Sequence, residues 1–313
     1  MTATVRLGTC AWVEKGLIAD WYPPHTTTAE ARLRFYAEHY DTVEVDSSYY
    51  AIPAERTTHN WAERTPPGFV FHIKAFGLMT GHAVRPEQLP VDLRPLVDKV
   101  TSRGHVVPSD ALRDRVFARF ARSLEPLRQA GKLGGVLFQL PPSALPGRAS
   151  WQRIEHAKEA LPDTELLVEF RQRDWLSTAL RDETLDSLRE RDLTYVAVDA
   201  PHVSSNNVVE TVVAATTQTG YVRFHGRNAA TWNHHGDGAS SRFDHLYSDA
   251  ELAEWVEPLR TLAQTTSRLY AVFNTNAATQ GPDNADRLRQ LLHDAQVPVS
   301  TAPGPAQGEL FQI

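Results

Sequence analysis

Polar and ionisable side chains follow short apolar runs at intervals along the whole chain. Their types suit anion binding and proton transfer, because an arginine can hold a phosphate or carboxylate through two parallel hydrogen bonds and a histidine titrates near neutral pH. Carboxylates can act as a second acid or base, or can fix the orientation of an imidazole. The residues at these positions are Glu44, Asp46, His72, Lys74, Gln139, Glu169, Arg171, Asp199, His225, Arg227 and Asn274.

The chemistry of each side chain indicates its role in such a site. We expect Arg171 and Arg227 to bind an anionic group of the substrate. His225 is the expected proton-transfer residue, because its ordinary pKa lies near neutrality. Glu169 or Asp199 would serve as a second acid or base, or would orient the imidazole. The predicted chemistry is therefore acid–base catalysis on a phosphate- or carboxylate-bearing substrate.

Lys74 has two interpretations. A desolvated lysine could form a Schiff base, which makes Lys74 a catalytic candidate, although an ion pair is the commoner use of such a residue. The polar groups could also pair inside the protein, Lys74 with Glu44 and Arg171 with Glu169. For the set as a whole a ligand site is favoured, because burying so many charges is costly unless they have partners. The further substrate-binding residues that we expect are Glu44, Asp46, Gln139 and Asn274.

Aromatic residues lie just past the predicted strand ends, where their rings could stack on a sugar face or a base. We expect Trp12, Tyr50 and Trp175 to contact the substrate in this way. The alternative is that these rings pack the loops that roof the site.

A metal site is possible but not favoured. Glu169, Asp199 and His225 are ligand types that bind Zn²⁺ or Mn²⁺. The interspersed arginines and the lysine already supply positive charge, however, and no closely spaced His-x-x-x-His or Glu-x-x-His motif supports a metal. We therefore expect no cofactor, with a divalent metal as the alternative.

Eight short runs rich in Val, Phe and Tyr have the length of buried parallel strands. They span residues 5–11, 42–46, 69–74, 135–139, 166–169, 195–199, 221–225 and 269–274. Helix-period segments lie between most of them, at residues 29–38, 109–130, 150–160, 181–191, 249–265 and 284–294. This alternation predicts an α/β fold, a single-domain TIM-type (β/α)8 barrel, in which functional groups gather at the carboxyl ends of the strands. An open doubly wound sheet is the alternative, but no Gly-x-Gly-x-x-Gly follows any strand.

Two connections depart from the plain repeat. The insertion after the third predicted strand is enlarged, and its residues 77–108 could form a lid over the barrel mouth or a disordered surface insertion. The crossover between the sixth and seventh predicted strands is abbreviated, with room for only a short helix. We expect residues 1–299 to form the barrel domain and residues 300–313, which are rich in Pro and Gly at first, to form a flexible tail.

The composition is that of an ordinary globular protein. The 313 residues carry a formal net charge of −6, with 42% hydrophobic and 22% charged residues, which argues against a general nucleic-acid coat but leaves room for a local basic cleft. No run of about 18 apolar residues predicts a membrane span, and residues 1–9 lack the pattern of a signal peptide. The lone Cys10 excludes an internal disulfide. We expect a cytoplasmic protein without a membrane partner.

Several ordered motifs together resemble one family. They are Gly8-Thr9-Cys10-Ala11-Trp12, Glu44-Val45-Asp46-Ser47-Ser48-Tyr49-Tyr50, Trp61, Phe138-Gln139-Leu140-Pro141-Pro142, Glu169-Phe170-Arg171, Arg223-Phe224-His225-Gly226-Arg227 and Phe273-Asn274. This pattern is similar to the YecE-like family, also called domain of unknown function family 72. The resemblance implies a TIM-type barrel, and the name of the family leaves its reaction open.

The chain departs from the family pattern at three positions of the predicted site. Cys10 stands where the family usually has Ser, and Asp46 stands where Asn is usual and adds a carboxylate. Asn274-Thr275 replaces the usual Asn-Asn pair, so that only Asn274 is carried over.

The end of the chain suggests a partner. Gln307, Leu310 and Phe311 resemble the Gln-x-x-Leu-Phe peptide that docks on the bacterial sliding clamp, with two apolar anchors and one amide for a pocket rim. A tail that folds back onto the barrel is the alternative.

Two functions follow from the sequence. The first is an enzyme that binds an anionic ligand at the barrel mouth, either a sugar-like small molecule or a nucleic-acid phosphodiester. The second is a non-catalytic module recruited to the machinery of DNA replication or repair through its tail.

Overall fold

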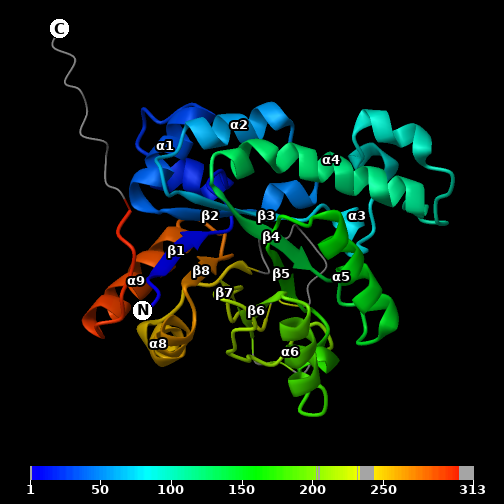
Figure 1. The fold of residues 1–313 in the computed structure, drawn as a ribbon. Helices are drawn as coiled ribbons and strands as arrows, with labels where there is room; N and C mark the ends of the chain where they lie inside the picture. The colour runs from blue at the N-terminus through cyan, green and yellow to red at the C-terminus, as the bar shows by residue number, and fades with distance from the viewer. Residues whose placement is uncertain (1, 202, 204, 231, 233–242, 303–313) are drawn as a thin grey trace, which may run out of the picture.

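The computed structural model describes residues 2–201, 203, 205–230, 232 and 243–302, and eight parallel strands form its centre (Figure 1). The strands are β1 (Val5–Thr9), β2 (Thr42–Val45), β3 (Val70–Lys74), β4 (Leu133–Gln139), β5 (Leu166–Glu169), β6 (Thr194–Asp199), β7 (Thr219–Phe224) and β8 (Arg268–Phe273). From β2 to β8 each strand pairs with the next along the chain, β1 pairs with β8, and the order is β1-β8-β7-β6-β5-β4-β3-β2. All eight predicted strands are confirmed within two residues at either end, and so is the TIM-type barrel.

The barrel closes between β1 and β2 through a side chain. Tyr36 of α1 (Ala29–His39) accepts a hydrogen bond from the backbone N–H of Thr9 at 2.9 Å and donates one to the carbonyl oxygen of Thr42 at 3.1 Å. The strands approach closely because Gly8 has no side chain: a Cβ at this position would lie 2.4 Å from the Thr42 oxygen. The Tyr36 hydroxyl thus satisfies one backbone donor and one backbone acceptor at the seam.

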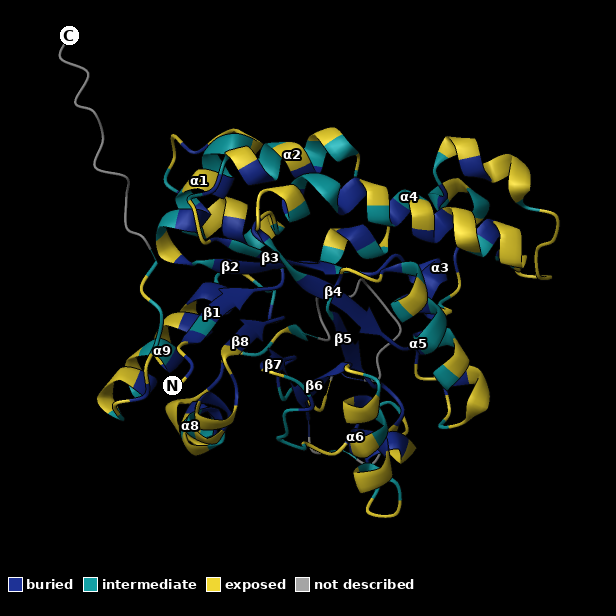
Figure 2. Ribbon diagram, in the orientation of Figure 1, coloured by how far each residue is buried: buried dark blue, intermediate teal, exposed yellow. Residues whose placement is uncertain are grey.

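The helices cover the outside of the barrel and leave their outer faces in solvent (Figure 2). Every residue of β2, β5, β6 and β7 is buried, as expected for parallel strands covered on both faces. Besides α1, the helices are α2 (Glu55–Glu63), α3 (Gly77–Thr80), α4 (Asp110–Gln129), α5 (Arg148–Ala160), α6 (Arg181–Glu190), α7 (Asp249–Ala253), α8 (Val256–Thr265) and α9 (Gln280–Asp294). Over the described residues, no helix has the length and apolar character needed to cross a membrane.

The insertion after β3 is folded against α4. It contains α3 and two short 3-10 helices, η3 (Pro86–Gln88) and η4 (Val91–Leu96). Its side chains Val84, Leu89, Leu93 and Val106 are buried in the core. A lid movement of this segment stays a prediction.

Two local features differ from the sequence expectation, and a third is compatible with it. Helix α2 was not predicted. The predicted helix at residues 249–265 is two helices, α7 and α8, separated at residues 254–255. Between β6 and β7 the described residues form no helix.

Candidate active site

Arg223 on β7 lies at the centre of a fully buried ion cluster. Its Nη1 donates to Oε2 of Glu169 at 2.5 Å, and its Nη2 donates to Oε1 of Glu44 at 2.6 Å. All three side chains are fully shielded from solvent. Each buried carboxylate therefore depends on the same guanidinium, and the cluster forms the floor of the barrel mouth.

Hydrogen-bond donors from several strands surround Glu169. It accepts a hydrogen bond from Nε2 of Gln139 at 2.6 Å, and Nη1 of Arg171 lies 3.5 Å from it. Burial opposes its charged form, but the positive charge of Arg223 together with the other donors holds the pKa of Glu169 well below its ordinary value. Glu169 is therefore a carboxylate at neutral pH, and it pairs with Arg171 as in the alternative that the sequence left open.

His225 is held from both sides. Its Nε2 lies 3.1 Å from Oε1 of Glu169, and its Nδ1 lies 3.0 Å from Nδ2 of Asn274. Because burial outweighs the attraction of Glu169, the pKa of His225 falls to about 4 and the ring is neutral near pH 7. Nε2–H then donates to Glu169, and Nδ1 accepts from Asn274. Both ring nitrogens are engaged inside the protein.

Glu44 on β2 and Asp46 in the turn after it form an acidic pair. Glu44 accepts a hydrogen bond from the Tyr221 hydroxyl at 3.0 Å, and burial together with neighbouring Asp46 raises the pKa of Glu44 to about 7, against the pull of Arg223. Asp46 lies 3.4 Å from Nζ of Lys74. Burial again favours the neutral form, but Lys74 and Arg223 hold the pKa of Asp46 below its ordinary value. Lys74 thus pairs with Asp46, and not with Glu44 as in the alternative that the sequence left open.

A cavity of about 410 Å³ lies above this floor. Of the predicted site residues, it is lined by Trp12, Asp46, Tyr50, Lys74, Gln139, Arg171 and Asn274. Further lining comes from Glu14, Trp61, Arg64, Phe243 and Asn276. The cavity thus combines aromatic rings, amides and charges of both signs, a mixture typical of small-molecule sites.

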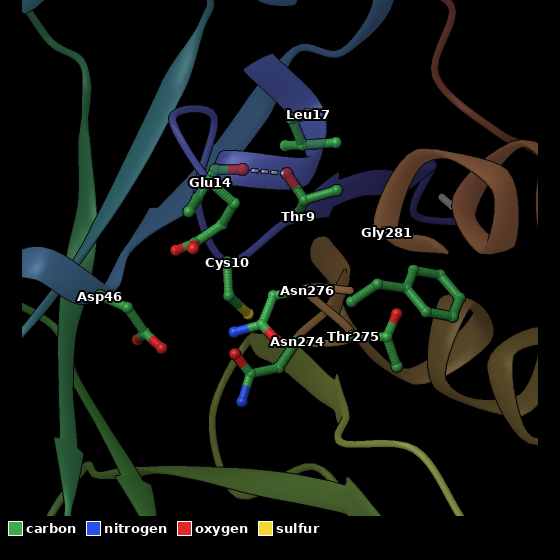
Figure 3. A pocket seen from close by; sticks show the side chains of 11 residues that line it. Thr9, Cys10, Glu14, Leu17, Asp46, Asn274, Thr275, Asn276 and Gly281 are labelled. Atoms are coloured by element: carbon green, nitrogen blue, oxygen red, sulfur yellow. Dashed lines mark hydrogen bonds between the residues drawn. The ribbon is translucent and has the colours of Figure 1, made fainter. Parts of the chain in front are cut away.

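A second, water-sized cavity of about 30 Å³ adjoins the first and shares Glu14, Asp46, Asn274 and Asn276 with it. In Figure 3 the Cys10 thiol and the two asparagine side chains point into the same space that Asp46 approaches from the opposite side. Oδ1 of Asn276 is buried and has no hydrogen-bond partner among the described residues. The size and the polar lining fit one water molecule, which could donate to this oxygen.

Asp199 and Arg227 form a separate cluster. Arg227 donates to both carboxylate oxygens of Asp199, at 2.6 Å for the shortest contact, and also to Glu254 at 2.7 Å. Asp199 accepts two more hydrogen bonds, from the Tyr247 hydroxyl at 2.6 Å and from Nε1 of Trp255 at 2.7 Å. Neither Asp199 nor Arg227 lines the cavity.

Other predicted positions also lie away from the cavity. Trp175 is buried, stacks on Phe170 and donates to the carbonyl oxygen of Ala144 at 2.7 Å. The ring of His72 packs edge-on against Tyr221 and Tyr270. Within the described part of the chain, no three His, Cys, Asp or Glu residues come together as metal ligands. Gln307, Leu310 and Phe311 fall outside the described residues.

Sequence reasoning missed several residues of the site. Arg223 could have been found, because it precedes His225 by two residues and so shares its side of β7. Trp61 belongs to the family motifs but lies on α2, which was not predicted. Glu14 and Asn276 lie in loops, where no periodicity indicates direction.

Comparisons with known proteins place the chain in one family. The family model described as "Protein of unknown function DUF72" matches residues 6–308. The UPF0759 protein YunF of Bacillus subtilis (strain 168) is 29% identical over 291 residues, covering 92% of this chain and 94% of that protein. The UPF0759 protein YecE of Escherichia coli O157:H7 is 25% identical over 307 residues, covering 94% of this chain and 98% of that protein. A solved DUF72 family protein of Thermotoga maritima MSB8 matches with a TM-score of 0.73 at 28% identity, over 93% of this chain and 99% of that one.

Proposed function

The chain belongs to the DUF72 family of proteins of unknown function, and from the chemistry of its cavity we propose that it is an enzyme for a small, sugar-like substrate that carries a phosphate or carboxylate. The observation that supports this most is the cavity of about 410 Å³ at the barrel mouth. Active sites of TIM-type barrels lie at this end of the strands.

The lining of the cavity supports this substrate class. Lys74 and Arg171 offer positive charge for an acidic group, and Arg171 can bind it through two parallel hydrogen bonds. Gln139 and Asn274 offer donors and acceptors for hydroxyl groups. The exposed ring of Tyr50 can lie against a sugar face. Together these groups suit a ligand with several hydroxyls and one acidic end.

Asp46 is the proposed general base. It is ionised, it lines the cavity, and it also lines the water-sized cavity beside it. Glu44 lies behind it and titrates near pH 7, so this pair can take up and release one proton in the working range. The base is within reach of both a substrate hydroxyl in the large cavity and a water in the small one.

The other predicted catalytic residues receive positioning roles. His225 and Glu169 are buried and fix the side chains of Asn274, Gln139 and Arg171 in the cavity wall. Asp199 anchors Arg227, Tyr247 and Trp255 beside the barrel. Lys74 holds Asp46 in its charged form and contributes to the anion site.

Calorimetric titration with sugar phosphates, sugar acids and their neutral parent sugars tests the substrate class. Arg171→Met should weaken binding of the acidic ligands about tenfold, the effect of losing roughly 1.4 kcal/mol, and should leave the neutral sugars unchanged. Arg173→Met is the matched control, because Arg173 is exposed and lines a different groove. Equal losses in both variants, or equal binding of acidic and neutral ligands, would contradict the proposal.

The role of Asp46 is tested separately with any ligand found in this way. Asp46→Asn keeps the shape of the side chain but cannot accept a proton, so the variant should bind the ligand and fail to convert it. Full turnover by this variant would remove Asp46 from the mechanism.

A further inference from the structure

Helices α4 and α5 border an open groove of about 420 Å³ that shares no lining residue with the cavity at the barrel mouth. Arg113 of α4 lines one side of the groove. The other side is one face of α5, where residues three and four apart stand next to each other. These residues of α5 are Ala149, Gln152, Arg153 and His156.

Arg153 brings a positive charge into this groove. Among the described residues, its guanidinium has neither a hydrogen bond nor an ion pair. Burial lowers the pKa of Arg153, and the positive charge of Arg113 lowers it further. A half-buried guanidinium beside a like charge costs stability, and a group of this kind marks a candidate binding site.

The backbone beneath Arg153 is shaped to receive its guanidinium. Gly81 ends α3 with a φ of +86°, and a Cβ there would lie 2.7 Å from Cζ of Arg153. A side chain at position 81 would displace the guanidinium from this place and would also be strained in this backbone conformation. The absence of a side chain thus lets the charged group lie against the turn.

The remaining charges around the groove leave its cations available. Asp110 holds Arg113 at 2.6 Å, but the carboxylate of Asp110 is 93% exposed, so the pair contributes little and can open for a ligand. Nε2 of His156 lies 3.5 Å from Asp114, and it is buried without a hydrogen-bond partner among the described residues.

The pKa of His82 is affected by charges of this groove and by charges of the barrel mouth. Burial lowers the pKa of His82 to about 4, and the positive charges of Lys74, Arg171 and Arg153 add to this shift. Cations of the cavity and of the groove therefore act on the same side chain.

We propose that the groove between α4 and α5 is a second anion site, in which Arg113 and Arg153 bind a phosphoryl group and Gln152 and His156 add hydrogen-bond donors. A phosphoryl group fits because its oxygens can accept hydrogen bonds from both guanidinium groups at once. The group can come from a free phosphate or pyrophosphate, or from the phosphodiester backbone of an oligonucleotide. The site does not depend on the function of the cavity, because none of its residues lines that cavity.

Titration of the full chain with inorganic pyrophosphate tests this site. Arg153→Met and Arg113→Met should each weaken binding about tenfold, whereas Arg148→Met should not. Arg148 is the matched control, because it lies on the same helix, is exposed and does not line the groove. Binding that is equal in all four proteins, or lost equally in the control, would overturn the proposal.

Thermal unfolding supplies a second readout that does not depend on loss of fold. Without ligand, Arg153→Met should unfold at the same temperature as the parent or higher, because it removes a charge without a partner. With pyrophosphate, the parent should be stabilised and the variant should not. A variant that is destabilised without ligand yet still stabilised by pyrophosphate would show a structural role and contradict the site.

A short single-stranded oligonucleotide distinguishes the two sources of the phosphoryl group. If the oligonucleotide binds and Arg153→Met weakens it, the groove accepts a phosphodiester. If only pyrophosphate responds to the substitution, the ligand is a small phosphate compound. Both results support the site. If Arg153→Met changes the binding of neither probe, the proposal is contradicted.

Discussion

Arg223 allows carboxylates from two other strands to lie together near the barrel axis. Glu44 and Glu169 each receive one of its Nη groups, so one guanidinium balances two buried charges. Removal of such a shared partner leaves carboxylates without compensation in a medium where that is costly. The cluster is therefore a fixed floor, and it holds the cavity residues Gln139 and Arg171 in place through Glu169.

The titration of Glu44 should be visible in the stability of the protein. Its folded pKa is raised from 4.5 to about 7, so the folded state holds the proton more tightly than the unfolded state. The stabilisation that this provides is present at low pH and is lost as the pH rises from about 4.5 through 7. The loss is about 1.4 kcal/mol for each pH unit that separates the pKa of Glu44 in the unfolded state from its pKa in the folded state.

Glu44→Gln mimics the protonated form and removes this dependence. Urea unfolding of the parent and the variant should give similar stabilities at pH 5, with the variant gaining on the parent between pH 5 and pH 8. A difference between the two proteins that does not change with pH would contradict the raised pKa. Glu63→Gln, at an exposed position of α2, is the control that should show no such trend.

Strand alternation predicted much of the site, but not how its members are divided. Glu44 with Asp46, and Glu169 with Arg171, lie together because residues two apart share a side of the strand. The same rule gave no sign that Asp199 lies apart from these residues. Its partners Tyr247 and Trp255 are 48 and 56 residues away in the sequence, and nothing local to Asp199 indicates them.

Secondary structure elements were predictable where burial is complete. The strands are apolar runs covered on both faces, so their boundaries follow from composition alone. Helix α2 was missed because most of its residues are polar and only Thr58 and Ala62 are buried. The insertion at residues 77–108 is built from single turns, which carry too few residues for a periodic signal.

The seam between β1 and β2 depends on one hydroxyl group. Tyr36→Phe would leave the N–H of Thr9 and the carbonyl of Thr42 each without one partner, and should lower the free energy of unfolding by about 1–3 kcal/mol. Tyr50→Phe is the control, since that side chain is 57% exposed. Chemical denaturation of both variants measures the effect, and equal stabilities would show that the seam does not need the hydroxyl.

At the scale of the whole molecule, the barrel extends to the last described residues. Val299 forms a β-bridge with Val5, and the N–H of Ser300 donates to the carbonyl oxygen of Val5 at 2.9 Å. We propose that the chain beyond this point is a tail outside the barrel domain. The residues that resemble a clamp-binding peptide lie beyond the described residues, and this resemblance rests on the sequence alone.

The tail makes a prediction about partners. Fluorescence binding of the full chain to the bacterial sliding clamp should be measurable and should be lost in Phe311→Ala, because Leu310 and Phe311 are the apolar anchors of the peptide. Gln307→Ala should weaken binding less. Identical signals from the parent and the Phe311→Ala variant would end the clamp hypothesis.

The central claim is that the cavity at the barrel mouth binds an acidic, sugar-like ligand beside Asp46, and a crystal structure with the tightest-binding sugar phosphate tests it most directly. We expect the phosphate on Arg171 and Lys74, and a substrate hydroxyl or an ordered water within hydrogen-bond distance of Asp46. A cavity that stays empty at saturating ligand, or a ligand bound elsewhere with its phosphate away from Arg171, would contradict the proposed function.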